Sequence, residues 1–399
     1  MKRHLSLSFR TLTFLFIVSL SFVPAGCSQQ HETPSEKSKT PAPLWGDAAN
    51  ERPSCVKGIH LTSWVAGSKK RRPQFEALLA ETELNTVVID IKEIEGTVFV
   101  PGVKLDNTID VHEQAMSDMQ SYLKFLKERG VFTIARIVVF KDQLLAKRKP
   151  EWAVHSSSPQ SKAVQAGFDK SVWVDRNGKA WADPYNPFVW KYNIDIAVRA
   201  AELGFQGIQF DYIRFPSDGN TKICVYSKLH TSESAVKALA TFTARAKERL
   251  APKGIEVSID VFGLAGSYKN DLGIGQKLSD LTSHVDVISP MMYPSHYAPS
   301  EYGLRDPNSS PYPTVLRSVD DTLNALKGTK VQLRPYFQDF SLGVKYTARH
   351  VRDQIEAAAA HGVEEWLLWN PSCHYTKEAL MPYAEKLYSH HDTPSNNKQ

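Results

Sequence analysis

The decapeptide GIQFDYIRFP, residues 207–216, decides the fold and directs attention to the chemistry of this chain. Its first half is mostly apolar, as in a parallel strand that is buried on both faces. Asp211 and Arg214 follow where the strand gives way to the loop residues 216–219, PSDG. In an α/β barrel the carboxyl ends of the strands carry the chemistry, so Asp211 is predicted to be catalytic or substrate-binding. The alternative is that Asp211 and Arg214 form a pair that only orders the loop.

Runs of the same kind recur along the chain. Seven further β-rich runs are residues 57–64, 86–93, 132–140, 255–263, 285–293, 331–340 and 364–370. Amphipathic stretches of good helix formers lie between them, and Gly130, Gly204, Gly254 and Gly362 stand where helices are expected to end. Eight βα units predict a single (β/α)8 TIM barrel of the α/β class. A doubly wound open sheet competes less well, because no Gly-rich phosphate loop follows the first strand.

The amino terminus has the features of an export signal. Residues 1–26 combine Lys2, Arg3 and Arg10 with an apolar segment, and VPAGC ends on Cys27. The segment is too short to span a bilayer, and the small residues before Cys27 resemble the lipobox of bacterial lipoproteins. We predict lipidation at Cys27, a membrane anchor and an exported protein of the bacterial cell envelope. The alternative is a secreted protein whose Cys27 is removed with the signal.

The predicted domain lies between two polar segments. Residues 27–54 are rich in Ser, Thr, Pro, Glu and Lys and are expected to form a disordered tether. Residues 55–390 form the predicted barrel domain, which we expect to be monomeric, and residues 391–399 form a flexible tail. Removal of residues 1–26 lowers the formal net charge from +5 to +2, and no basic run interleaved with aromatic residues follows, so nucleic acid is not an expected partner.

Metal and cofactor motifs are not expected. Cys55, Cys224 and Cys373 are widely spaced with no CxxC pair, so they predict no zinc site. The DRNG turn at residues 175–178 is not followed by the further acids of a calcium loop. We therefore predict neither a metal nor a cofactor.

The strand ends are polar and aromatic as a set. The predicted substrate-binding residues are His60, Trp64, Asp90, Lys92, Glu93, Arg136, Arg214, Tyr293, His296, Arg334, Gln338, Trp369 and Asn370. Sugar rings stack on aromatic side chains, and their hydroxyls need carboxylate, amide and guanidinium partners. A loop at residues 172–192, with Trp173, Trp181, Asp183, Tyr185 and Asn186, is predicted either to form a substrate lip over the barrel mouth or to pack locally.

Hydrolysis of a glycosidic bond needs two carboxyl groups, one protonated and one ionised. Asp211 is the predicted nucleophile or base. Asp260, on the neighbouring strand, is the first choice for the proton donor. Asp339, across the mouth, and Glu93, at the end of the second strand, are the alternatives.

Six sequence blocks also resemble a known family. VKGIHLTSW, VVIDIKEIEG, GIQFDYIRFP, VDVISPMMYPSHY, RPYFQDF and WLLWN are similar to a bacterial glycoside-hydrolase-like family first catalogued as a domain of unknown function. The resemblance covers residues 55–385 and implies a TIM-barrel glycosidase-like domain of exported or envelope proteins. The α-amylase clan is a looser comparison: Asp211 matches its strand-4 nucleophile, whereas strand 5 carries Asp260 in place of the clan's Glu.

The sequence thus predicts a hydrolase that cleaves a cell-envelope or extracellular polysaccharide. The alternative function is a glycan-binding lipoprotein without activity, and action on an amide or ester of peptidoglycan is a weaker third possibility.

Overall fold

The structure, a computed structural model, describes residues 52–382. The predicted signal peptide, Cys27, most of the tether and the tail lie outside the described residues. Within residues 52–382, no helix is long and apolar enough to cross a membrane.

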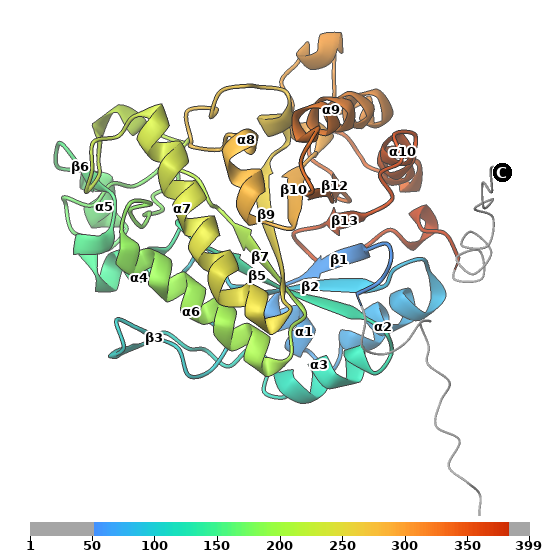
Figure 1. The fold of residues 1–399 in the computed structure, drawn as a ribbon, viewed down its shortest axis with the longest axis horizontal. Helices are drawn as coiled ribbons and strands as arrows, with labels where there is room; N and C mark the ends of the chain where they lie inside the picture. Colours follow the sequence, from blue (N-terminus) through green and yellow to red (C-terminus); the bar gives the residue numbers. More distant parts are fainter. Residues whose placement is uncertain (1–51, 383–399) are drawn as a thin grey trace, which may run out of the picture. The chain divides into compact units, whose positions relative to one another are not determined.

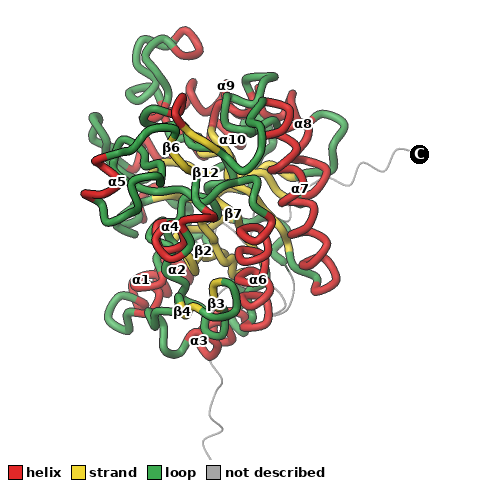
Figure 2. Tube along the Cα trace, turned by 90° about the vertical axis from the view of Figure 1, so that its left-hand side faces the viewer, coloured by secondary structure: helices red, strands yellow, loops and turns green. Residues whose placement is uncertain are grey.

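Eight parallel strand positions close into a barrel at the centre of a ring of helices (Figures 1 and 2). The strands are β1 (Lys57–Leu61), β2 (Thr86–Lys92), β5 (Phe132–Val138), β7 (Gly207–Asp211), β9 (Glu256–Phe262), β10 (Val287–Met291), the pair β11 (Gln332–Leu333) and β12 (Tyr336–Gln338), and β13 (Trp366–Trp369). Strand β9 pairs with both β7 and β10, and β13 pairs with both β12 and β1, so the sheet closes on itself. The predicted (β/α)8 barrel is confirmed.

The seventh strand position is interrupted at Arg334 and Pro335. Gln332 pairs with Val287 at its beginning, and Tyr336 pairs with Met291 further along. Proline has no backbone N–H to donate to the ladder, which explains why β11 and β12 are separate strands of one position.

Helices and short outer strands complete the domain. The helices are α1 (Ser63–Gly67), α2 (Arg72–Glu81), α3 (Met119–Lys127), α4 (Gln143–Arg148), α5 (Ser161–Gln165), α6 (Pro187–Leu203), α7 (Ser232–Leu250), α8 (Leu278–Leu281), α9 (Pro311–Leu326) and α10 (Ala348–Ala359). The outer strands are β3 (Lys104–Leu105) with β4 (Ile109–Asp110), and β6 (His155–Ser156) with β8 (Cys224–Val225).

Helix α6 illustrates how local sequence sets the boundaries. Its first residue is Pro187, and the Asn186 side chain accepts a hydrogen bond from the Phe188 N–H at 2.9 Å. Its end is set by Gly204, whose φ of 114° is a left-handed conformation that glycine adopts readily. Helices α6 and α7 lie side by side along the barrel (Figure 1).

The barrel interior is layered. Val88 and Ile134 belong to an apolar cluster. Asp90 and Arg136 stand two residues further along the same two strands, so their side chains leave the sheet on the same side as Val88 and Ile134. The apolar layer is therefore followed, toward the carboxyl ends, by a charged layer.

Candidate active site

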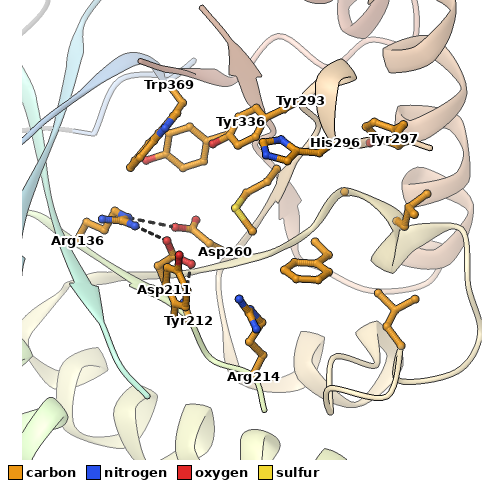
Figure 3. Close-up of a pocket in the computed structure, with 15 residues that line it drawn as sticks. Arg136, Asp211, Tyr212, Arg214, Asp260, Tyr293, His296, Tyr297, Tyr336 and Trp369 are labelled. Atoms are coloured by element: carbon orange, nitrogen blue, oxygen red, sulfur yellow. Dashed lines mark hydrogen bonds and ion pairs between the residues drawn. The ribbon is translucent and has the colours of Figure 1, made fainter. Parts of the chain in front are cut away.

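A cavity of about 540 Å³ opens at the carboxyl ends of the barrel strands. Its lining is Arg136, Asp211, Tyr212, Arg214, Asp260, Phe262, Gly263, Leu264, Leu272, Met291, Tyr293, His296, Tyr297, Tyr336 and Trp369, most of which Figure 3 labels. The lining combines four acidic or basic side chains with several aromatic rings.

Arg136 on β5 lies at the centre of the charged layer. Its Nη1 donates to Asp90 Oδ1 at 2.5 Å, and its Nη2 donates to Asp211 Oδ2. Its Nε lies 3.7 Å from Asp260 Oδ2. One buried guanidinium therefore contacts three carboxyl groups that come from three different strands.

Asp90 is held on its other side by His60. The His60 Nε2 lies 2.8 Å from Asp90 Oδ2, and the His60 ring stacks on Trp369 with centroids 3.9 Å apart. Burial favours protonation of Asp90, but the charges of His60 and Arg136 outweigh it and lower its pKa. Asp90 is thus ionised, and it orients both the Arg136 guanidinium and the His60 ring that stacks on Trp369.

Asp211 is held by main chain and side chain together. Its Oδ1 accepts from the Tyr212 N–H at 2.5 Å, and its Oδ2 receives the Arg136 bond. Tyr212 has a φ of 52°, a left-handed conformation that is costly for a bulky residue. Both carboxyl oxygens of Asp211 are therefore fixed by hydrogen-bond donors.

Asp260 is in a different environment. It is 2 % exposed, and its Oδ1 has no hydrogen-bond partner among the described residues. Burial raises its pKa well above the ordinary value, the charge of Asp211 raises it further, and Arg136 opposes both. Among the acids around Arg136, Asp260 is therefore the one whose raised pKa favours the protonated form.

The two carboxyl groups are close together. Both contact neighbouring nitrogens of the Arg136 guanidinium, which limits their separation to less than about one nanometre. Figure 3 shows them side by side on the same face of the cavity. This range includes the separations used by retaining and by inverting glycosidases.

The opposite wall is aromatic and tightly packed. The Tyr336 Oη donates to Gln209 Oε1 at 2.7 Å, which fixes its ring beside Trp369. At Gly263 a Cβ atom would lie 2.7 Å from the Met291 carbonyl oxygen, so only glycine fits there.

The structure gathers about half of the predicted site residues around the cavity. Those that line it are Asp211, Asp260, Arg136, Arg214, Tyr293, His296 and Trp369. His60 and Asp90 lie directly behind them: His60 is bonded to Asp90, and Asp90 is bonded to Arg136. Glu93 and Trp64 do not line the cavity: Trp64 is half exposed beside Phe99, and Glu93 has a buried Oε1 without a partner.

Two of the predicted substrate-binding residues are placed wrongly by the sequence analysis. Arg334 is fully buried at the opposite, amino-terminal end of the barrel, where it is bonded to Glu256 and Glu365. Lys92 is also fully buried, and its Nζ lies 2.7 Å from Asp142 Oδ2 and 3.1 Å from Asn193 Oδ1 in α6. The Lys92 side chain thus points out of the barrel toward α6. The pairing of β2 with β5 has a register shift between Asp90 and Lys92, at the place where this change of direction occurs.

The predicted residues at the ends of β12 and β13 hold the loops together. Gln338 Oε1 accepts from the Ser295 N–H at 3.1 Å, and Asn370 donates to the Asp339 carbonyl oxygen. Both Asp339 carboxyl oxygens accept from Thr376, at 2.7 and 2.8 Å. Burial raises the pKa of Asp339 to about 6. None of the three lines the cavity, so their predicted substrate contacts and the alternative of Asp339 as proton donor lose support.

The predicted lip packs locally. Trp173, Trp181 and Tyr185 are buried, and Trp173 Nε1 donates to the Asn220 carbonyl oxygen at 3.0 Å. Asp183 accepts from the Ser227 N–H at 2.7 Å. Asn186 caps α6, so these residues position the loop, and only Trp181 approaches the cavity, through its contact with Arg214.

Several residues that line the cavity were not predicted from the sequence. They are Tyr212, Phe262, Leu264, Leu272, Met291 and Tyr297. Tyr212 and Tyr297 belong to the sequence blocks GIQFDYIRFP and VDVISPMMYPSHY, but whether their side chains reach the cavity depends on the conformation of the loops. Within residues 52–382, no group of three or more His, Cys, Asp or Glu residues is arranged to hold a metal ion.

Comparisons with known proteins place the fold and the family. Residues 58–375 match the DUF4015 family, described as "Putative glycosyl hydrolase domain". Among solved structures, a hypothetical protein from Ruminiclostridium thermocellum ATCC 27405 is 33% identical over 51% of this chain and 97% of its own, with a TM-score of 0.43. Among curated proteins no match was found.

Two more distant structures share the fold. The PgaB (BpsB) glycoside hydrolase domain from Bordetella bronchiseptica is 12% identical over 80% of this chain and 94% of its own, with a TM-score of 0.54. The alpha-galactosidase TtGalA from Thermus thermophilus is 14% identical over 84% of this chain and 61% of its own, with a TM-score of 0.50. At these identities the likeness concerns the fold alone. The match over residues 58–375, which confirms the resemblance found in the sequence blocks, shows that the chain belongs to the family of "Putative glycosyl hydrolase" domains.

Proposed function

We propose that the protein is a glycoside hydrolase that cleaves a polysaccharide with Asp211 and Asp260. The observation that carries the proposal is that the two carboxyl groups beside Arg136 lie in different environments. Asp211 receives two hydrogen bonds, whereas Asp260 is buried with Oδ1 unpartnered and its pKa is raised. One ionised and one protonated carboxyl side by side are what glycosidic bond cleavage requires.

In the proposed reaction, Asp260 gives its proton to the glycosidic oxygen as the bond to the anomeric carbon breaks. Asp211 either attacks that carbon or removes a proton from the attacking water. The negative charge that then develops on Asp260 lies 3.7 Å from Arg136 Nε, which favours proton release. Arg136 is kept in position by Asp90, which in turn is held by His60.

The aromatic lining supports a carbohydrate substrate. Trp369, Tyr293 and Tyr336 lie on the wall facing the carboxyl pair (Figure 3). Their rings offer apolar surface for sugar faces, and the Tyr hydroxyls and carboxyl groups offer partners for sugar hydroxyls.

We also propose that the enzyme is exported and anchored through Cys27, acts on a glycan of or near the cell envelope, and is a monomer. The support is the signal-like sequence of residues 1–26 and the polar segment that follows. Mass spectrometry of the mature amino terminus tests this: an acylated Cys27 supports the anchor, and an unmodified terminus beyond Cys27 supports secretion.

Release of reducing ends from a panel of envelope and plant polysaccharides tests the hydrolase proposal. The wild type is expected to release them from at least one glycan, whereas Asp211→Asn binds the same glycan and releases none. A matched control is Asp286→Asn, which changes a half-exposed carboxylate paired with Lys247 outside the cavity. A wild type that binds oligosaccharides and cleaves no member of the panel would favour the glycan-binding lipoprotein.

A further inference from the structure

Arg214 is enclosed by aromatic rings on the wall of the cavity. Its guanidinium carbon lies 4.8 Å from the ring centre of Trp181, 4.9 Å from that of Tyr212 and 4.8 Å from that of Phe262. In Figure 3 the guanidinium group is directed toward the side of the cavity where Asp211 and Asp260 lie. The rings thus hold a cation at a fixed position in the proposed substrate cleft.

Arg214 has no acidic partner within the described part of the chain. No carboxylate oxygen of residues 52–382 lies within 4.0 Å of its nitrogens. Its Nη1 donates to the Phe215 carbonyl oxygen at 3.2 Å and to Ser217 Oγ at 3.0 Å. These two bonds orient the guanidinium and leave Nε and Nη2 without a protein acceptor among the described residues.

The other cations of this region are paired. Lys141, which lies over the same Trp181 and Tyr212 rings, contacts Asp175 at 2.8 Å. Arg136 contacts Asp90 and Asp211. Arg214 is therefore the cation of the cavity lining whose charge the described residues leave without a direct partner.

The Arg214 side chain is only partly exposed, so water hydrates its charge incompletely. Burial lowers the pKa of Arg214, and the partial compensation by Tyr212, Asp211 and Asp218 does not restore it. A desolvated guanidinium gains most from an anion that accepts two parallel hydrogen bonds, as carboxylate, sulfate and phosphate groups do. A neutral sugar hydroxyl offers one acceptor and no charge.

We propose that Arg214 binds a negatively charged substituent of the glycan, so that the substrate is an anionic polysaccharide. The inference rests on the proposed function in taking the cavity as the glycan site. Asp211 is paired directly with Arg136, whereas no carboxylate of the described residues pairs directly with Arg214, so an anionic substituent beside Arg214 would be its first direct ion-pair partner.

Calorimetric binding in the Asp211→Asn background tests the proposal without relying on hydrolysis. The probes are oligogalacturonate, sulfated galactan oligosaccharides and a neutral glycan that carries glycerol-phosphate substituents, each beside its carboxyl-reduced, desulfated or dephosphorylated counterpart. At least one charged probe is expected to bind more tightly than its neutral counterpart, with an affinity that falls as salt is added. Addition of Arg214→Met is expected to weaken that binding about 10- to 100-fold and to change the neutral counterpart by less than about twofold.

Two further variants separate charge from packing. Arg176→Met removes an equal charge from an exposed side chain paired with Asp218, and is expected to leave binding within about twofold of the parent. Arg214→Lys keeps the charge but loses the planar guanidinium that can donate two parallel hydrogen bonds. Its affinity for the charged probe is therefore expected to lie between that of the parent and that of Arg214→Met.

The proposal is overturned by equal losses for charged and neutral probes in Arg214→Met, or by an absence of binding of all three charged probes. If Arg214→Met does not fold, as judged by near-UV circular dichroism, the same comparison is made with Arg214→Lys, for which equal losses again overturn it. Failure of hydrolysis with Arg214-dependent binding intact would reject the proposed reaction and retain the anion site.

Discussion

Two buried arginine clusters occupy opposite ends of the same barrel, and they differ in how completely they are paired. At the amino-terminal end, Arg334 donates to Glu256 at 2.7 and 2.9 Å and to Glu365 at 3.0 Å. Arg52 also contacts both glutamates at 2.6 Å, so two cations face two anions. At the carboxyl-terminal end, a single arginine, Arg136, faces three acids, Asp90, Asp211 and Asp260, and His60 contacts one of them.

The difference separates a structural ion-pair network from a reactive one. All nitrogens of the Arg334 guanidinium have acceptors, and the cluster borders no part of the cavity. The Arg136 cluster leaves Asp260 Oδ1, Arg136 Nε and His60 Nδ1 without hydrogen bonds among the described residues. More carboxyl groups than cations, and buried polar atoms without hydrogen bonds, both raise the free energy of the folded state. Such features are expected at a site where proton transfer is needed.

The largest expected effect is the loss of turnover in Asp211→Asn. The amide keeps the shape of the side chain but cannot act as nucleophile or base, so kcat is expected to fall by about 10²- to 10⁴-fold. Reducing-end assays measure kcat, and circular dichroism confirms folding. Turnover within tenfold of the wild type would remove Asp211 from the mechanism.

The second effect is on stability at the opposite end of the barrel. Arg334→Met leaves two buried glutamates with Arg52 as their remaining cation, and is expected to lower the free energy of unfolding by about 3–5 kcal/mol. Urea denaturation measures it, while kcat of the folded enzyme should stay within about twofold. A large loss of kcat without loss of stability would show that the two clusters are not distinct.

The third effect has the opposite sign. The pKa of Asp260 is raised in the folded state, so folded protein binds this proton more tightly than unfolded protein does. Stability from Asp260 is therefore present at low pH and is lost as pH rises above the ordinary carboxyl range. Asp260→Asn is expected to lower kcat by about 10²-fold and to raise the free energy of unfolding at neutral pH by about 1–3 kcal/mol.

Urea midpoints of the wild type and Asp260→Asn, measured between about pH 4 and 8, check this. The gap between the two proteins should widen as pH rises. A variant that is less stable than the wild type at every pH would mean that Asp260 is a structural carboxylate.

The smallest effect concerns Glu93, the alternative proton donor. Burial, followed by the charges of Asp90 and Glu95, raises its pKa to about 7. The contribution of Glu93 to stability is thus lost between about pH 4.5 and 7. Glu93→Gln is expected to reduce the change in the free energy of unfolding over this pH range. The reduction should be less than about 1 kcal/mol, because the residue is half-buried. Turnover should remain within about tenfold. A loss as large as that of Asp260→Asn would transfer the donor role to Glu93.

The barrel was predictable because its signals are local. Apolar runs such as residues 207–211 predict strands, and Gly204 predicts a helix end, so eight units and their closure follow from the sequence. The convergence of Asp211, Asp260 and Arg136 also follows, since the carboxyl ends of parallel strands meet at one face.

The errors arose where the direction of a side chain depends on irregular backbone. The Arg334–Pro335 break places Arg334 at the amino-terminal end of its strand position, although the run 331–340 reads as one strand. The register shift at Lys92 turns that side chain to Asn193 and away from the mouth. The position of Tyr212 in the cavity lining depends on a left-handed backbone conformation, which could not be predicted from the residue type.

A carbon-13 NMR titration of the aspartate carboxyl groups, with Asp260→Asn used to assign the resonance, tests the central claim most directly. The claim is that the two carboxyls beside Arg136 differ in protonation. We expect the Asp260 signal to remain that of a protonated acid at pH values above the ordinary aspartate range. A signal that titrates near pH 4 would show that Asp260 carries no proton to donate, and would contradict the account.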